Sequence, residues 1–413
     1  MNIVVQKFGG TSVRDEESRE RAKKHIESAV SDGYKVVVVV SAMGRMGDPY
    51  ATDTLLSLVG EQNPTISDRE MDMLVSCGEI ISSVVFTNML NQAGISAAAL
   101  NGGQAGFRTN GDHTNARIIE MKCDRLLQTL ETHDVVVVTG FQGISKVGDI
   151  TTLGRGGSDT SAAALGVALQ AEWIDIFTDV EGVMTADPRI VGDAKPLSVV
   201  TYNEIVNMAY QGAKVIHPRA VEIAMDAKVP IRVRSTYSDA PGTLVTTIDK
   251  RRGVEVKDRL ITGIAHVTNV TQLKVQAKKG QYNLQTEVFK AMANEKISVD
   301  FFNITPNGVV YTVSGEMTAR AVNKLKELGY EPQVTEKCAK VATVGAGMNG
   351  VPGVTARIVT ALSEKGIQIL QSADSLSTIW VLVKESEMKE AINALHKAFH
   401  LSDGPVGAEV VDF

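Results

Sequence analysis

The sequence predicts an α/β protein: a three-layer αβα sandwich with a mostly parallel sheet, followed by two small ferredoxin-like units. Two observations support this prediction. Over about the first 245 of 413 residues, short runs rich in valine and isoleucine alternate with longer helical stretches, the order typical of a parallel sheet covered on both faces. Beyond residue 260 the sequence repeats itself with an offset of 70 positions.

The first part supplies the sandwich. Its strands are expected at residues 3–6, 35–41, 97–100, 134–141, 173–177 and 230–235. Its helices are expected at residues 15–30, 68–90, 159–169 and 202–210. The valine run at 35–41 shows no polar alternation, which indicates a strand buried on both faces.

The repeat defines the second part. Apolar positions 288, 292 and 297 match 358, 362 and 367, and the alternating positions 309, 311 and 313 match 379, 381 and 383. Each copy is expected to run strand, helix, strand, strand, helix, strand, which is the βαββαβ order. A turn-rich and charged stretch at residues 238–253 precedes it. We therefore expect domains at residues 1–245, 260–335 and 336–413.

Composition narrows the class of protein. The formal net charge is −6, so neither nucleic acid nor an anionic membrane is an expected partner. The three cysteines lie far apart and have no metal-ligand or disulfide spacing, which favours a reducing cytoplasm. The first residues are too polar for a signal peptide, and no apolar run has the ~18 residues of a membrane helix.

A first glycine loop, Lys7-Phe8-Gly9-Gly10, directly follows the first strand. Two glycines let backbone amides approach an anionic oxygen, and Lys7 can place a positive charge on a transferring phosphoryl group. A tight turn without function explains the same glycines about equally well. Neither a GxxxxGK[ST] nor a GxGxxG motif occurs in the sequence.

A second glycine loop, residues 154–159, opens the helix expected at 159–169. Ser158 or Asp159 is expected to cap that helix. Capping does not explain Arg155 between its glycines, and an arginine with small neighbours is suited to grip a carboxylate. Two such loops on one sheet predict two anionic ligands that face each other, as phosphoryl transfer requires.

Other residues have competing interpretations. Glu79 is either a solvated helix residue or a carboxylate in an apolar setting that needs a cationic partner. Thr178 and Asp179 follow a strand, where ligands collect on such sheets. Asp187-Pro188 is an ordinary turn signal, Lys214 alone would be a surface residue, and His217 is expected to be structural.

Together these segments resemble the amino-acid-kinase superfamily and, within it, the monofunctional bacterial aspartate kinases with tandem ACT domains. The resemblance covers essentially the whole chain. It rests on segments in family order: KFGGTS at 7–12, SAMG at 41–44, SCGE at 76–79, GFQG at 140–143, TTLGRGGSDTSA at 151–162, TDVEGVMTADPR at 178–189 and GAKVIHPRAVE at 212–222.

The resemblance implies a role for each matching residue. Candidate catalytic residues are Lys7, Arg155 and Asp159. Candidate aspartate contacts are Ser41, Thr52, Glu79, Arg155 and Ser158, with Glu79 taking the α-ammonium group. Candidate ATP contacts are Lys7, Phe8, Gly9, Gly10, Thr178, Asp179, Met184, Arg189, Lys214 and Val215. Magnesium is expected mainly on the ATP phosphates, with no protein ligand assigned.

The implied reaction is transfer of the γ-phosphoryl group of MgATP to the aspartate β-carboxylate, with feedback through the ACT domains and a homodimer or higher homo-oligomer. Two departures bear on this. Met184 stands where many relatives have Tyr, and Gln281-Tyr282-Asn283 stands where the second repeat has the turn at residues 351–353. The effector therefore stays open between lysine, threonine and diaminopimelate. The alternatives are a glutamate or acetylglutamate kinase and a non-catalytic amino-acid sensor.

Overall fold

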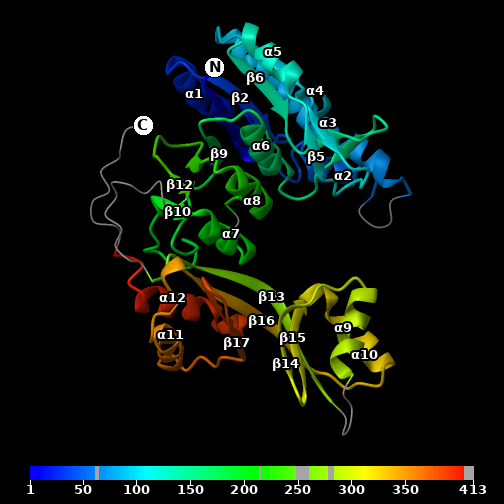
Figure 1. Ribbon diagram of the computed structural model, residues 1–413, viewed down its shortest axis with the longest axis vertical. Coiled ribbons are helices and arrows are strands. Elements are labelled where there is room, and N and C mark those ends of the chain that lie inside the picture. Colours follow the sequence, from blue (N-terminus) through cyan, green and yellow to red (C-terminus); the bar gives the residue numbers. More distant parts are fainter. Residues whose placement is uncertain (61–64, 214, 248–259, 278–282, 349, 404–413) are drawn as a thin grey trace.

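The computed structural model describes residues 1–60, 65–213, 215–247, 260–277, 283–348 and 350–403. Two parts follow one another along the longest axis of the molecule (Figure 1). The N-terminal part contains an eight-stranded sheet and a small four-stranded sheet, and the C-terminal part contains a six-stranded sheet.

The eight-stranded sheet has the order β10-β12-β11-β9-β1-β2-β6-β3. Its parallel strands are β1 (Ile3–Phe8), β2 (Lys35–Val40), β3 (Ala97–Leu100), β6 (Val135–Thr139), β9 (Ile174–Thr178) and β11 (Ile231–Ser235). The mostly parallel sheet is thus confirmed. The sequence did not predict β10 (Val199–Thr201) and β12 (Thr243–Thr246), the two short strands at one side of the sheet that run antiparallel to the others.

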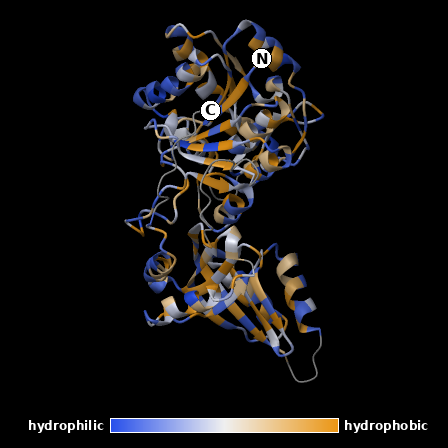
Figure 2. Cartoon of the chain, turned by 60° about the vertical axis from the view of Figure 1, so that its left-hand side comes forward, coloured by the Kyte–Doolittle hydropathy of each residue, from blue (hydrophilic) through white to orange (hydrophobic). Residues whose placement is uncertain are grey.

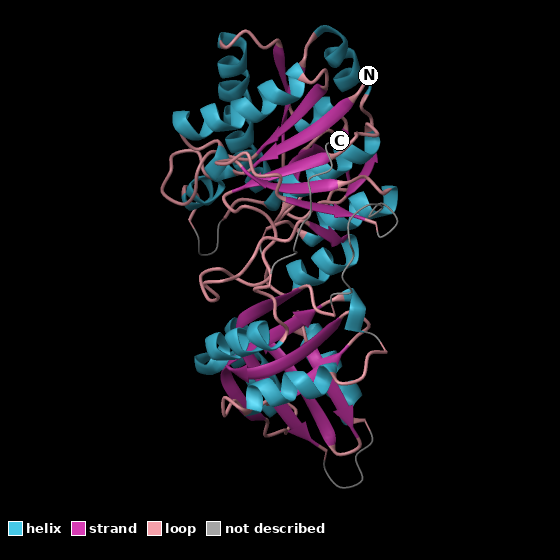
Figure 3. Cartoon of the chain, turned by 90° about the vertical axis from the view of Figure 1, so that its left-hand side faces the viewer, coloured by secondary structure: helices cyan, strands magenta, loops and turns pink. Residues whose placement is uncertain are grey.

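Helices cover both faces of this sheet, which confirms the three layers (Figure 3). Alternate valines of β2 separate the two cores. Val36 and Val38 pack in the cluster that contains α1 (Glu16–Ser31) and α3 (Asp68–Gln92). Val37 and Val39 belong to the other cluster, with helices α5 (Asp124–Thr132), α6 (Gly157–Ala168), α7 (Tyr202–Tyr210) and α8 (Pro218–Ala227). The buried strands form the apolar centre visible in Figure 2.

Helix α3 is long and apolar enough, by length and composition, to cross a membrane. It packs instead as a core helix, with Phe86 and Leu90 fully buried against the sheet. Its buried face also contains Asp72, Ser76 and Glu79, which suits a helix that borders a polar site.

The four-stranded sheet was not predicted, because its strands are only three or four residues long. It consists of β4 (Phe107–Thr109), β5 (Ile118–Met121), β7 (Gln142–Ile144) and β8 (Ile150–Thr152). The buried carboxylate of Asp72 ties it to α3 by accepting hydrogen bonds from the Thr152 hydroxyl at 2.5 Å and the Thr114 amide at 3.0 Å. Strand β8 leads directly into the second glycine loop, so this sheet positions that loop.

The C-terminal part follows the predicted repeat. Helix α9 (Leu284–Asn294) matches α11 (Val354–Ser363), β14 (Asp300–Thr305) matches β17 (Gln371–Asp374), β15 (Gly308–Ser314) matches β18 (Thr378–Lys384), and α10 (Thr318–Glu327) matches α12 (Met388–Ala398). Matching positions are buried in both copies: Val288 with Ile358, and Met292 with Leu362. Two copies of one sequence pattern therefore build two similar cores.

The two copies are joined more closely than two separate units would be. Strand β13 (Gly263–Gln276) pairs with β15 through its second half and with β16 (Gln333–Val344) along almost its whole length. Strand β16 in turn pairs with β18. One six-stranded sheet, β14-β15-β13-β16-β18-β17, therefore spans both copies. The division at residues 335 and 336 stays a prediction, and any last strand of the second copy lies outside the described residues.

The two parts of the molecule share buried surface. Ala342 and Val344 of β16 belong to the same apolar cluster as Met208 of α7. Polar contacts add to this packing: Thr185 Oγ1 lies 2.9 Å from His396 Nε2, and the Thr262 hydroxyl donates to Glu204 Oε1 at 2.5 Å. The C-terminal sheet thus packs directly against the N-terminal part and forms hydrogen bonds with it.

Candidate active site

The predicted site residues gather where parallel strands of the large sheet end. Gly9 follows β1, Ser41 follows β2, Gly140 follows β6, and Thr178 is the last residue of β9. Because these strands are neighbours and parallel, their carboxyl ends lie at one edge of the sheet. Ligands of open α/β sheets bind at this edge.

Lys7 and Asp159 form the central charge pair. Lys7 Nζ lies 2.7 Å from Asp159 Oδ1, and both side chains are only 13% exposed. The second oxygen of Asp159 accepts the backbone N–H of His217 at 3.1 Å. The carboxylate therefore fixes the ammonium group beside the first glycine loop, at the start of α6.

The first glycine loop is shaped by close backbone packing. A Cβ on Gly10 would lie 2.6 Å from the Gly44 carbonyl oxygen, so only glycine fits there. A Cβ on Gly9 would lie 3.5 Å from Lys7 Nζ. Within the described residues neither glycine amide donates a hydrogen bond. Two free amides next to a lysine ammonium group form a site suited to phosphate oxygens.

The second glycine loop bends sharply into α6. Gly154 and Gly156 have φ angles of +73° and +70°, and a Cβ on Gly156 would lie 2.1 Å from His217. The expected cap by Ser158 or Asp159 is wrong: α6 begins at Gly157 after Gly156, without a side-chain cap. Those two side chains are used elsewhere, on Ser41 and Lys7.

Arg155 projects from this loop. It is exposed, and no hydrogen bond or ion pair joins its side chain to any residue that the structure describes. A guanidinium group without a partner, held between two glycines in left-handed backbone, is available to an anionic ligand.

Two hydroxyls connect the glycine loop to the end of β2. Ser41 Oγ donates to Ser158 Oγ at 3.0 Å. Gly140 makes this approach possible, since a Cβ there would lie 2.7 Å from Ser158 Oγ. Thr52, the first residue of α2 (Thr52–Ser57), is half-buried on the segment that follows Ser41. The structure thus joins Ser41 with Ser158, whereas Thr52 makes no hydrogen bond to either serine in the described part of the chain.

The buried interpretation of Glu79 is correct. Its side chain is 2% exposed, and Oε1 accepts the Ala42 backbone N–H at 3.0 Å. Its other oxygen, Oε2, is buried and has no hydrogen-bond partner in the described structure. Burial raises the pKa of this carboxyl to about 8. A cationic ligand group would satisfy the free oxygen and favour the ionised form.

The nucleotide-side residues are less closely assembled. The Thr178 hydroxyl donates to Asp179 Oδ1 at 3.2 Å. Arg189 makes a two-pronged contact with Asp187, at 3.0 and 2.7 Å, and its side chain is 87% exposed. Met184 is half-buried and forms an isolated antiparallel β-bridge with Pro196. Val215 is half-buried, and Lys214 lies outside the described residues.

Comparison with known proteins agrees with this arrangement. The amino acid kinase family matches residues 2–235. Aspartokinase 1 of Bacillus subtilis (strain 168) is 68% identical over 403 residues, which cover 97% of this chain and 100% of that protein. The chain belongs to the aspartokinase family. An aspartokinase of Mycolicibacterium smegmatis is 41% identical over 97% of both chains.

The C-terminal part and the overall arrangement are also those of aspartokinases. An ACT domain matches residues 333–397. The structure of Escherichia coli aspartokinase III in complex with aspartate and ADP superposes with a TM-score of 0.77 at 27% identity, covering 96% of this chain and 99% of that one. A second structure of that enzyme, in complex with lysine and aspartate, gives a TM-score of 0.78 at 28% identity.

Sequence reasoning missed two features of this aspartokinase-family site. The Ala42 amide holds Glu79, and Arg45 forms an ion pair with Asp179 at 3.1 Å. A backbone amide has no sequence signal. Arg45 lies one residue beyond the SAMG segment, and nothing in the sequence indicates that it meets Asp179, which follows a different strand.

Proposed function

We propose that this chain transfers the γ-phosphoryl group of MgATP to the β-carboxylate of L-aspartate, giving 4-phospho-L-aspartate and ADP. The observation that supports it best is the placement of Lys7 and the free Gly9 and Gly10 amides at the same sheet edge as the unpaired Glu79 oxygen. The solved E. coli relative is described in complex with aspartate and ADP.

The reaction needs little acid–base chemistry. A carboxylate with a pKa of about 4 is already ionised at neutral pH and can attack the γ-phosphorus directly. Its oxygen forms the new P–O bond while the bond to the β-phosphate oxygen breaks and ADP leaves. The difficulty is electrostatic, because two anions must meet. The fixed Lys7 ammonium group and the two loop amides offset that repulsion at the transferred group.

The second grip holds the amino acid. We assign Arg155 to an aspartate carboxylate and Glu79 to the α-ammonium group, with Ser41, Ser158 and Thr52 nearby. An ammonium group on Glu79 supplies the cation that its buried oxygen lacks. A substrate without a free amino group would leave that carboxyl unpaired, which argues against acetylglutamate.

Magnesium is proposed to enter this site bound to the nucleotide. Within the described residues no group of three or more His, Cys, Asp or Glu side chains could hold a metal ion. Asp159 is occupied by Lys7 and the His217 amide. We therefore place Mg²⁺ on the ATP phosphates, where it would neutralise charge on the transferred group.

The C-terminal part is proposed to sense a pathway end product, with lysine, threonine and diaminopimelate as the candidates. The relative in complex with lysine and aspartate is described as a T-state. We also propose a cytoplasmic homo-oligomer that pairs through this part, since β14 and β17 form the two edges of the six-stranded sheet.

The decisive assay measures ADP release from MgATP with aspartate, glutamate or N-acetylglutamate as acceptor. The proposal expects turnover with aspartate, together with an acyl phosphate that hydroxylamine traps as aspartyl hydroxamate. Faster turnover with glutamate or N-acetylglutamate would identify another carboxylate kinase. No turnover with any acceptor would favour a non-catalytic sensor.

A further inference from the structure

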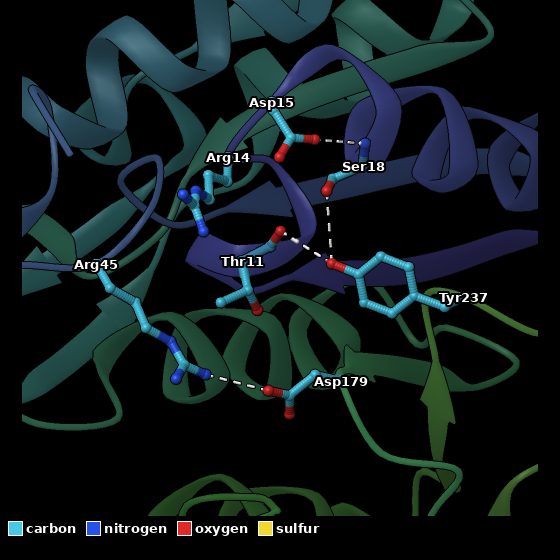
Figure 4. Close-up of a pocket in the computed structure, with 7 residues that line it drawn as sticks. All are labelled: Thr11, Arg14, Asp15, Ser18, Arg45, Asp179 and Tyr237. Carbon is cyan, nitrogen blue, oxygen red and sulfur yellow. Dashed lines mark hydrogen bonds and ion pairs between the residues drawn. The ribbon is translucent and has the colours of Figure 1, made fainter.

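The side chain of Arg45 reaches across the carboxyl end of β1 and contacts Asp179. It lies on the loop after β2, whereas Asp179 follows β9, and β1 runs between these two strands. The ion pair between them, 3.1 Å from Nη2 to Oδ2, therefore crosses the edge where the first glycine loop begins. Figure 4 shows the Arg45 side chain reaching Asp179 beside Thr11.

The backbone around Arg45 is fixed to that glycine loop. The Gly44 amide donates to the Gly10 carbonyl at 2.9 Å, and Gly44 has a φ of +87°. The Arg45 amide donates to Asp48 Oδ2 at 2.8 Å. Only the long side chain of Arg45 is therefore free to change partner.

The ion pair lies on a pocket of about 270 Å³ lined by Thr11, Arg14, Asp15, Ser18, Arg45, Asp179 and Tyr237. Arg14 and Arg45 lie on the same side of it in Figure 4. Two of the charged side chains are already engaged, because Asp15 accepts the Ser18 amide and Arg14 Nε lies 3.4 Å from Asp48. Arg45 therefore lies in this pocket, beside the first glycine loop, where its exposed guanidinium group can meet a ligand.

Energetics favour an exchange of partners. Arg45 and Asp179 are 71% and 50% exposed, and an ion pair this exposed contributes little to stability. A guanidinium group bonded to a phosphate in two-pronged geometry is a stronger and more specific contact. A triphosphate on the glycine loop therefore competes well for Arg45.

We propose that Arg45 is a further phosphate-binding residue, which rests on the proposed kinase function: it pairs with Asp179 in the empty site and transfers to the terminal phosphates of ATP when the nucleotide binds. The ligand class is a nucleoside triphosphate, and the contact is to its β- and γ-phosphates rather than to the nucleoside. Release from Arg45 leaves Asp179 free for the rest of the nucleotide.

The test is calorimetric binding of MgATP, ADP and AMP to the full chain and to Arg45→Gln, Arg45→Lys and Arg320→Gln. Arg320 is a matched control, since it is an exposed arginine paired with Glu295 in the C-terminal part. Arg45→Gln is expected to weaken MgATP binding by ~10-fold or more and to leave AMP binding unchanged. Arg45→Lys should fall between, and Arg320→Gln should match the parent chain.

A second variant separates direct from indirect action. In the Asp179→Asn background, Arg45→Gln should still weaken MgATP binding, and by at least the factor seen in the parent chain, because Arg45 then binds phosphate without first breaking an ion pair. If the effect disappears in that background, Arg45 acts only through Asp179 and the inference is wrong. Equal losses for MgATP, ADP and AMP would also overturn it.

These outcomes are distinct from failure of the proposed function. A parent chain that binds MgATP but phosphorylates no aspartate would overturn the kinase assignment. A parent chain that is active, with an Arg45→Gln variant that binds MgATP normally, would overturn only the role of Arg45. Thermal melting of each variant checks that it is folded.

Discussion

Lys7 Nζ lies 2.7 Å from a carboxylate oxygen of Asp159, and this pair joins the two glycine loops of the site. Lys7 is next to the first loop, and Asp159 belongs to the helix opened by the second. The ammonium group is therefore held in place before any ligand arrives. Preorganised charge of this kind is the main requirement of phosphoryl transfer.

Replacing Lys7 tests this placement. Lys7→Ala should lower kcat by ~10²–10³, because one preorganised contact to the transferred group is lost. The melting temperature should fall, because the mostly buried Asp159 carboxylate loses its cation, so kcat is compared at a temperature where both proteins are folded. Lys35→Ala is a suitable control, since Lys35 forms an ion pair with Asp134 at the opposite end of the neighbouring strand. Near-normal kcat in Lys7→Ala would remove Lys7 from the mechanism.

Arg155 should act on the amino acid rather than on the nucleotide. Arg155→Ala is expected to raise KM for aspartate by a factor corresponding to roughly 1.5–3 kcal/mol, the cost of a lost charged hydrogen bond. Steady-state kinetics with each substrate varied in turn measures this. Arg125→Ala, which removes another exposed arginine, one on α5 and outside the site, should leave KM unchanged. A rise confined to KM for ATP would mean that the two loops have the opposite roles.

Glu79 predicts a pH dependence of stability. Its pKa is raised to about 8 in the folded chain from an ordinary 4.5, so between these pH values the folded form binds the extra proton. Stability should therefore fall as pH rises through this window. Relative to Glu79→Gln, the parent chain should lose free energy of unfolding between about pH 5 and pH 9 in urea titrations. Parallel pH profiles for the two proteins would contradict the buried, proton-binding carboxyl.

The same carboxyl predicts proton release when aspartate binds. An ammonium ligand favours ionised Glu79, so the proton held at neutral pH must leave. Calorimetry in buffers of different ionisation enthalpy should detect this release in the parent chain and not in Glu79→Gln. Proton uptake, or an equal signal in both proteins, would argue that Glu79 does not meet the ammonium group.

The contact between Thr185 and His396 predicts a separation of activity from regulation. Thr185 lies within the expected nucleotide segment, and His396 lies on α12 of the C-terminal part, 2.9 Å away. His396→Ala should weaken inhibition by the effector while basal kcat stays unchanged. Inhibition curves with lysine, threonine and diaminopimelate would measure the loss, against a typical coupling free energy of ~1–3 kcal/mol. Full inhibition in this variant would place the coupling elsewhere.

Much of the fold could be predicted from the sequence, because the patterns that indicate its strands and its repeat are local. The valine runs of β2 and β6 and the 70-residue repeat indicate strands and repeated cores directly. The four-stranded sheet escaped prediction, since strands of three or four residues are specified by their partners rather than by their own pattern. The sharing of β13 and β16 between the copies escaped for the same reason: pairing partners are not written in a strand's own sequence.

The sequence predicted which residues form the candidate site, but it did not predict which of them contact one another. Glycines and a lysine after a strand indicate an anion site, whereas the pairing of Lys7 with Asp159 depends on the fold. Glu79 stayed open between a solvated and a buried carboxylate, because the sequence does not reveal how deeply α3 inserts. The neighbouring Gly78 shows that depth, since a Cβ on it would lie 2.7 Å from Ala42 Cβ. Arg45 gave no signal because its partner follows another strand.

In the proposed mechanism, two anion-binding groups of residues face each other at one edge of the sheet. A crystal structure of the chain with ADP and aspartate tests it most directly. We expect the diphosphate to bind the Gly9 and Gly10 amides beside Lys7, with an aspartate carboxylate on Arg155 and the aspartate ammonium group on Glu79. Nucleotide bound away from Lys7, or Arg155 turned into solvent with aspartate present, would contradict it.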